Sequence, residues 1–265
     1  MDIRDLPIPG HEFLAKVNAR HPWSHNDHFH GWILRNLPAR RGVAVDIGCG
    51  KGVLAGKLAA QFAHVTGVDR NEGMAAAASA RLRGFPQVSI RRCDFADFSS
   101  TAGDGGADLI TMVAVLHHLD TGAALAAIPR LVAPGGRLLV VGLARPDSVA
   151  DLAFEVVSAA ANPVVGVIKH PRAVRPPERA VDAQPVMPVM DPTTTFAEIS
   201  NAARAHLPGS TVRRRLFFRY TLRWDKPQFG SSCSADPSFV RGRGFPAVPG
   251  EGPGEGPGVV ETHGD

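Results

Sequence analysis

The sequence predicts an α/β fold in which helices cover both faces of a mostly parallel seven-stranded sheet. Two observations predict it. From residue 43 onward, apolar runs typical of strands alternate with helical segments, and the first apolar run ends in a glycine-rich turn. Helices of roughly ten to fifteen residues between strands place those strands in parallel. Ligands of such sheets bind at the carboxyl ends of the strands, so the functional site is expected at that edge.

The elements are expected in a regular order. A helix over residues 11–37 breaks around His21–Pro22 and stops at Pro38. Strands are expected at residues 43–48, 64–69, 88–94, 107–116, 135–143, 210–216 and 217–225. Further helices are expected at residues 52–62, 72–83, 121–132, 148–161 and 194–206. The last of these helices has a capping signal between Thr193 and Thr195, and the stretch from 95 to 106 is expected to be a loop.

Three parts of the chain are expected to differ in character. Residues 1–40 are predicted to form a helical lid, and residues 41–229 the α/β domain. Within that domain, residues 145–192 are interpreted as an insertion or second lid, because they include a proline-rich stretch of little periodicity. Residues 230–265 contain EGPGEGPG, cannot bury enough apolar surface to order, and are expected to be a disordered tail.

Composition narrows the class of protein. The 265 residues are 44% hydrophobic and 20% charged, a balance that supports a buried core. The net charge of +4 comes from scattered cations with one run at Arg213–Arg215, which we interpret as a solvated strand edge. Cys49, Cys93 and Cys233 form no CxxC pair, so no disulfide framework is expected. Because no signal core or long apolar run is present, we expect a cytoplasmic protein without membrane contact.

The main functional signal is the segment DIGCGKG, which follows the first strand. Its glycines, Gly48, Gly50 and Gly52, permit a sharp turn and a close approach of a ligand to the backbone. The next helix presents its free N–H groups to the same ligand. Asp69 ends the second strand, 23 residues after Asp46, where a carboxylate can accept hydrogen bonds from both ribose hydroxyls. Together these features predict a nucleoside site.

The glycine spacing resembles the first motif of the class I S-adenosylmethionine-dependent methyltransferases, an acid followed by G-x-G-x-G. The dinucleotide-binding fingerprint has the different spacing G-x-G-x-x-G. Further matches to the family are GVDR, RCDFADF, VAVLHHL and LVAPGGRLLVVG, and the ending RRRLFFRYTLRWDKP looks like the closing hairpin of its ubiquinone- and menaquinone-biosynthesis-like branch. The resemblance spans about residues 40–227 and implies a Rossmann-like three-layer sandwich whose last strand is antiparallel.

The resemblance also implies the cofactor, S-adenosyl-L-methionine, and a set of residues around it. Asp46 would orient the glycine loop toward the cofactor's amino group, and residues 93–95 would surround the adenine. The full implied set is Asp46, Gly48, Cys49, Gly50, Gly52, Asp69, Arg70, Met74, Cys93, Asp94, Phe95 and Val113. From the residues alone, Cys49 is equally a small filler in the loop, and Phe95 is equally a core residue.

Three histidines are candidates for a general base: His117, His118 and His28. Methyl transfer is an in-line displacement at a sulfonium carbon, so the protein mainly aligns the nucleophile and excludes water. A base is needed only when the acceptor loses a proton. By resemblance, His117 and His118 lie where the acceptor pocket opens and His28 lies in the lid. A structural role for the LHHL turn is the alternative.

No metal is expected. His25, Asp27, His28 and His30 cluster in the sequence, but helical spacing places only His25 and His28 on one face. A helix start rich in polar residues explains the cluster as well.

The acceptor is expected to be a small molecule. The family's Asn/Asp-Pro-Pro-aromatic motif for exocyclic amines of nucleic acids is replaced by VAVLHHL, so no nucleic-acid partner is expected. Valines and an isoleucine within residues 164–168 suggest an apolar or aromatic acceptor of the secondary-metabolite kind. The alternatives are an RNA-modifying methyltransferase, a dehydrogenase-like nucleotide-binding module and a non-catalytic cofactor-binding protein. The methylated atom (C, O or N) and the oligomeric state stay open.

Overall fold

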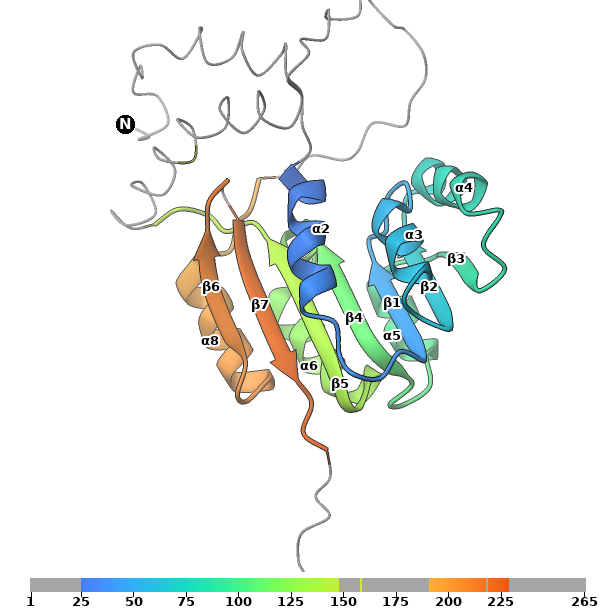
Figure 1. Ribbon diagram of the computed structural model, residues 1–265. Coiled ribbons are helices and arrows are strands. Elements are labelled where there is room, and N and C mark those ends of the chain that lie inside the picture. The colour runs from blue at the N-terminus through green and yellow to red at the C-terminus, as the bar shows by residue number, and fades with distance from the viewer. Residues whose placement is uncertain (1–24, 148–157, 159–190, 218, 229–265) are drawn as a thin grey trace, which may run out of the picture. The chain divides into compact units, whose positions relative to one another are not determined.

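A seven-stranded sheet forms the centre of the protein (Figure 1). The computed structural model describes residues 25–147, 158, 191–217 and 219–228. The strands are β1 (Val43–Ile47), β2 (His64–Asp69), β3 (Val88–Arg92), β4 (Ala107–Val113), β5 (Val132–Gly142), β6 (Thr211–Arg215) and β7 (Arg219–Asp225). Their order is β3-β2-β1-β4-β5-β7-β6. Strands β1 to β5 pair in parallel, and β7 is antiparallel to both β5 and β6, which confirms the predicted fold.

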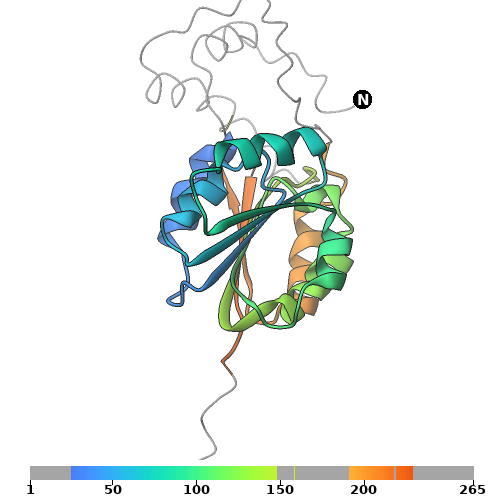
Figure 2. The ribbon, with the colours of Figure 1, turned by 90° about the vertical axis from the view of Figure 1, so that its right-hand side faces the viewer.

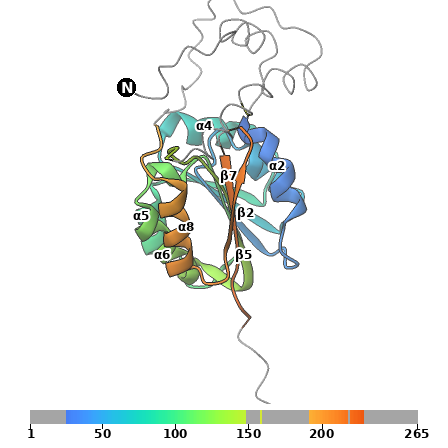
Figure 3. The same ribbon diagram turned by 90° about the vertical axis from the view of Figure 1, so that its left-hand side faces the viewer.

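Helices cover both faces of this sheet, as Figures 2 and 3 show from two sides. The helices are α2 (His25–Arg35), α3 (Val53–Ala59), α4 (Glu72–Arg81), α5 (Phe95–Thr101), α6 (Thr121–Leu131) and α8 (Phe196–His206), with a 3-10 turn, η2 (Leu116–His118). None of the helices among the described residues has the length and apolar character needed to cross a bilayer.

Two apolar cores hold the layers together, one on each face of the sheet. The first core joins α5, α6 and α8 to the sheet, and the second joins α2 and α3 to it. Neighbouring residues of one strand alternate between them: Ile110 belongs to the first core and its neighbour Leu109 to the second, and both are fully buried. This alternation follows from the two-residue period of a strand, and it explains why the central strands read as continuous apolar runs.

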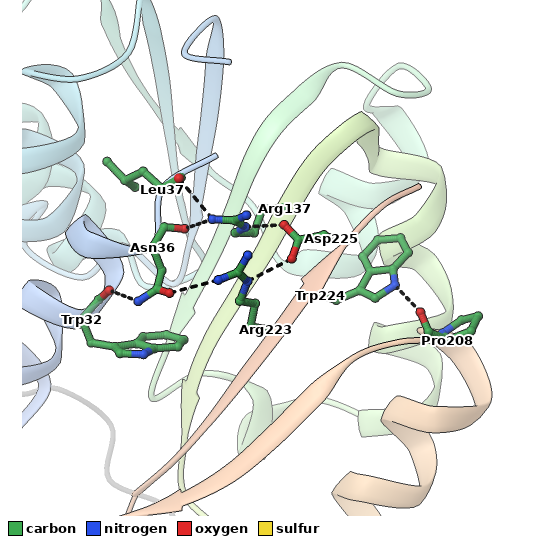
Figure 4. Close-up of polar contacts among 8 residues, drawn as sticks. All are labelled: Trp32, Asn36, Leu37, Arg137, Pro208, Arg223, Trp224 and Asp225. Atoms are coloured by element: carbon green, nitrogen blue, oxygen red, sulfur yellow. Dashed lines mark hydrogen bonds and ion pairs between the residues drawn. The ribbon is translucent and has the colours of Figure 1, made fainter. Parts of the chain in front are cut away.

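Helix α2 is anchored to the sheet by a polar network at the edge opposite the carboxyl ends of the parallel strands (Figure 4). Nη1 of Arg137 donates to the backbone carbonyls of residues 36–37, and Nη1 of Arg223 donates to Oδ1 of Asn36 at 3.3 Å. Both guanidinium groups also pair with Asp225. Because these contacts hold its end, α2 lies fixed against one face of the sheet.

Two parts of the expected element order are wrong. The stretch from 95 to 106 contains helix α5, whose N-terminus is capped by Asp94 through a 2.8 Å bond from the backbone N–H of Asp97. Strand β4 ends at Val113, because Ala114 has a φ of 56° and turns the chain out of the sheet. The signal at Thr195 is confirmed: it caps α8, and Glu198 completes a capping box.

Several expectations lie outside the described residues. They are the first part of the N-terminal helix, the helix at 148–161, most of the insertion at 145–192, the tail at 230–265 and Cys233.

Candidate active site

The loop after β1 has the backbone geometry that the glycines predict. Gly48, Gly50 and Gly52 have φ values of 67°, 52° and 74°, in the left-handed region that favours glycine. The backbone N–H groups of Gly48 and Cys49 both donate to the carbonyl of Val68, at 2.7 and 3.0 Å. The loop therefore turns sharply and stays tied to the end of β2.

Gly48 also brings two loops into contact. A Cβ added at Gly48 would lie 2.1 Å from Cγ2 of Val115, far below a normal contact distance. Val115 follows β4 and directly precedes the turn η2. Because only a hydrogen fits at this point, the glycine loop packs directly against the segment that carries His117 and His118.

Asp69 occupies the predicted place at the end of β2 and shapes the loops around it. Its Oδ2 accepts a hydrogen bond from the backbone N–H of Gly50 at 2.8 Å, and its Oδ1 accepts from that of Asn71 at 2.9 Å. The side chain is partly exposed. Each carboxylate oxygen has a second lone pair, so the group can accept further hydrogen bonds from a ligand.

Asp46 is buried at the end of β1. Its Oδ1 accepts a 2.7 Å hydrogen bond from the hydroxyl of Thr111 on β4. Burial raises the pKa of Asp46 to about 7, against the opposing effect of the Thr111 hydrogen bond, and the charge of Asp69 raises it further. A cation beside Asp46 would favour its ionised form.

Besides Asp46, three residues of the implied cofactor set have buried side chains. Cys49 is 8% exposed, and its sulfur lies 3.0 Å from where a Cβ on Gly67 would stand, so it packs against β2. Burial raises the pKa of the Cys49 thiol, and the charges of Asp46 and Asp69 raise it further. A reactive cysteine needs a lowered pKa, so these surroundings do not activate the thiol as a nucleophile. Met74 is 2% exposed, and Phe95 is part of the first core. Their roles around a cofactor stay predictions.

The remaining residues of the set are more open. Asp94 and Arg70 are exposed, and Cys93 and Val113 are partly buried. One oxygen of Asp94 caps α5, as described above. All four follow or end a parallel strand at the carboxyl edge of the sheet, the edge at which ligands of such folds bind.

The two histidines of η2 lie side by side, with ring centroids 4.0 Å apart. His117 is buried and His118 partly buried. Burial lowers the pKa of His117 to about 4, and the charges of His118 and Arg219 lower it further. Burial and the charge of Arg70 lower the pKa of His118. Both rings are therefore neutral near pH 7.

Helix α2 begins at the same edge of the sheet. His28 meets the ring of Phe217 edge-on at 5.3 Å, which places it beside the strand hairpin. His30 is buried, and its Nδ1 lies 3.1 Å from Nζ of Lys57 on α3. Across the described part of the chain, no three His, Cys, Asp or Glu side chains are grouped as a metal site requires.

Arg219 is the site residue that the sequence reasoning missed. It begins β7, which pairs with the carboxyl end of β5 through Gly142 and Tyr220. Its Nη2 donates to Oδ1 of Asn26 on α2 at 3.0 Å, and burial lowers its pKa to about 10. In the sequence, Arg219 looks like any other arginine of an alternating strand, so no local signal distinguishes it.

Three features together define a Rossmann-like nucleoside-binding protein: the order of the strands, the glycine loop after β1, and Asp69 at the end of β2. Comparisons with known proteins narrow this class. A family model described as a methyltransferase domain matches residues 45–138. An uncharacterized methyltransferase of Mycobacterium tuberculosis is 30% identical over 210 residues, which cover 78% of this chain and 98% of the relative.

Two further proteins extend the comparison. A ubiquinone biosynthesis O-methyltransferase of Aromatoleum aromaticum is 36% identical over 111 residues, 40% of this chain and 46% of that relative. A solved structure from Methanococcus maripaludis, described as an S-adenosyl-L-methionine-dependent methyltransferase, shares the fold with a TM-score of 0.51. It is 14% identical, and the match covers 84% of this chain and 94% of that one. The chain belongs to the class I S-adenosylmethionine-dependent methyltransferases.

The residues present fit the cofactor of this family, S-adenosyl-L-methionine. The charge of Asp69 lies close enough to Asp46 to raise the pKa of that carboxyl group, and the two acids are complementary to a ligand with ammonium and sulfonium cations. The left-handed glycine turn exposes backbone for close approach, and Asp69 has lone pairs to accept from ribose hydroxyls.

Proposed function

We propose that the chain transfers a methyl group from S-adenosyl-L-methionine to a C, O or N atom of a small-molecule acceptor with an apolar or aromatic body. One observation carries this proposal: Gly48 of the cofactor loop packs directly against Val115, beside the turn that presents His117 and His118. A small acceptor bound at that turn would lie next to the cofactor. The similarity to a ubiquinone biosynthesis O-methyltransferase, whose name implies a small-molecule pathway, supports the proposal.

The cofactor supplies an electrophilic methyl group, so the chain's main task is alignment and exclusion of water. In this proposal, Asp69 holds the ribose, the glycine turn borders the methionine portion, and Asp94 with Phe95 borders the adenine. The lids expected at residues 1–40 and 145–192 would border the acceptor, and most of both segments lies outside the described residues. The start of α2 beside Phe217 is consistent with such a cover at the carboxyl edge.

The histidine pair acts mainly by positioning. A pKa of about 4 makes His117 a weak base, since general bases work best when their pKa lies near the working pH. The neutral rings can still hydrogen-bond an acceptor, and they can take a proton from a group that is already acidic. His28, packed against Phe217, is proposed to line the acceptor pocket rather than to remove a proton.

An RNA acceptor is less well supported. In the arginine run on β6, the Arg214 guanidinium lies 4.0 Å over the ring of Phe196, and Nε of Arg215 donates to Thr221 at 3.1 Å. These contacts engage the two side chains within their own sheet and helix layer. The run therefore has a structural explanation that needs no nucleic acid.

The test is an acceptor screen. The full chain is incubated with S-adenosyl-L-methionine and, in separate reactions, with small phenols, small carboxylic acids or bulk RNA, and mass spectrometry detects a mass increase of one methyl group. We expect methylation of a small molecule, lost when Gly48→Ala blocks the cofactor loop. Methylation of RNA alone would overturn the proposal. A fall of orders of magnitude in His118→Gln would show that the turn does more than position the acceptor.

A further inference from the structure

Three buried side-chain nitrogens at the carboxyl edge have no hydrogen-bond partner: Nε of Arg219, Nδ1 of His117 and Nδ1 of His118. In the described ranges, only two more buried side-chain atoms lack a hydrogen-bond partner, one on Arg41 and one on Asp108. Asp108 lies at the opposite end of β4 and forms an ion pair with Arg40. A buried polar atom without a partner is costly, so folded proteins rarely keep one without a purpose. Three together indicate that a ligand completes this site.

The three side chains lie close to one another. The rings of His117 and His118 are 4.0 Å apart, and the charge of Arg219 reaches His117. Arg219 makes its hydrogen bond to the neutral side chain of Asn26, and no carboxylate of the described residues pairs with it. A second cation, Arg70, acts on His118 from the end of β2. Among the described residues, two cations therefore act on the histidine turn, and Arg219 forms no ion pair with a carboxylate.

The opposite side of the site is acidic. Asp46 and Asp69 end the neighbouring strands β1 and β2, and the Asp69 charge raises the pKa of Asp46. In the proposed function, the cations and ribose hydroxyls of S-adenosyl-L-methionine face these two acids. The cofactor therefore accounts for both carboxyl groups. The cation Arg219 has no such use, and it lies at the start of β7, separated from the two acids by β4 and β5 in the sheet.

We propose that Arg219 binds a carboxylate of the acceptor, so that the substrate class is a small carboxylic acid held by its anionic group next to the histidine turn. This inference rests on the proposed function. A carboxylate fits better than a phosphate does, because the one buried guanidinium matches two coplanar oxygens, whereas phosphate sites usually combine several charged donors and the second cation here, Arg70, is exposed. The bound anion would accept from Nε of Arg219 and place a negative charge beside this guanidinium.

The test uses the full chain saturated with S-adenosylhomocysteine, with benzoate and its neutral isostere benzamide as probes. The side-chain Nε–H resonance of Arg219, assigned by its loss in Arg219→Lys, reports contact directly in heteronuclear NMR spectra. We expect benzoate, and at higher concentration acetate, to shift this resonance. Benzoate is expected to bind about tenfold or more tightly than benzamide, the range for a hydrogen bond to a charged group. Arg219→Met is expected to remove the preference.

A matched control is Arg223→Met, which removes an arginine four positions along the same strand that already pairs with Asp225. This variant is expected to keep the preference for benzoate. An Arg219 resonance that neither carboxylate shifts, or a response to inorganic phosphate but not to carboxylates, would overturn the inference while S-adenosylhomocysteine binding stands. Failure of S-adenosylhomocysteine to bind the wild type would refute the proposed function itself, and the inference with it.

Discussion

An alanine at Gly48 would place a methyl group where the loop after β1 meets the loop after β4. The φ of 67° at this position costs a residue with a side chain about 1–2 kcal/mol. The added Cβ would stand 2.1 Å from Cγ2 of Val115, and inserting a methyl group into a packed contact costs roughly 1–3 kcal/mol more. Gly48→Ala should therefore lower the free energy of unfolding by roughly 2–5 kcal/mol.

Val115→Ala separates the two contributions. It removes Cγ2 and so relieves the contact, but it leaves the backbone strain at position 48 unchanged. In urea unfolding of the two single variants and the double variant, we expect the double variant to regain roughly 1–3 kcal/mol relative to the sum of the single effects. Gly122→Ala is a suitable control, because Gly122 lies in helix α6, where alanine is favoured over glycine.

Additive effects would refute this reasoning. If the two single losses add within about 0.5 kcal/mol, then the loops do not touch at this point. The same variants connect stability with function, because the affinity for S-adenosylhomocysteine should fall in Gly48→Ala and recover in part when Val115 is shortened.

Two further predictions concern buried charge. Thr111→Val removes the hydrogen bond that opposes the raised pKa of Asp46, so this pKa should rise above about 7. A carboxyl group whose folded pKa exceeds its unfolded value of 3.8 loses its stabilising contribution as pH rises, so melting temperatures of the variant should keep falling to higher pH than those of the wild type. Asp225→Asn leaves the mostly buried Arg137 guanidinium without its carboxylate partner, although its hydrogen bonds to the carbonyls of residues 36–37 remain. Because Asp225 is partly exposed, we expect the free energy of unfolding in urea to fall by only about 1–2 kcal/mol. The control Asp104→Asn changes an exposed ion pair and should lower it by less than about 1 kcal/mol. Equal losses in the two variants would contradict this prediction.

The sheet could be predicted from the sequence because its signals are local. The apolar runs of β1 and β4 each reflect burial on both faces of one strand. The seven-residue helix α5 was missed because it is too short for a helical period to be visible, although Asp94 carried a capping signal. The end of β4 was missed because alanine rarely adopts the positive φ of Ala114, so its residue type gave no warning.

The site was only partly predictable for a similar reason. The glycine loop and Asp69 are marked by their position after strands, so their place could be expected. Arg219 becomes notable only when β7 pairs with β5 and brings it to His117 and Asn26, which lie 102 and 193 positions before it in the sequence. Contacts of this range depend on topology, and a single sequence does not record which arginine of a strand lacks a carboxylate partner.

The most direct test of the account is calorimetric titration of S-adenosylhomocysteine into the wild type and Asp69→Ala, with Asp104→Ala as the control variant and NADH as the control ligand. We predict binding by the wild type and by Asp104→Ala. Affinity should be lower by about tenfold or more in Asp69→Ala, which loses the hydrogen bond from Gly50 and the proposed acceptor for the ribose hydroxyls. Preference for NADH, or equal affinity of the wild type and Asp69→Ala for S-adenosylhomocysteine, would contradict it.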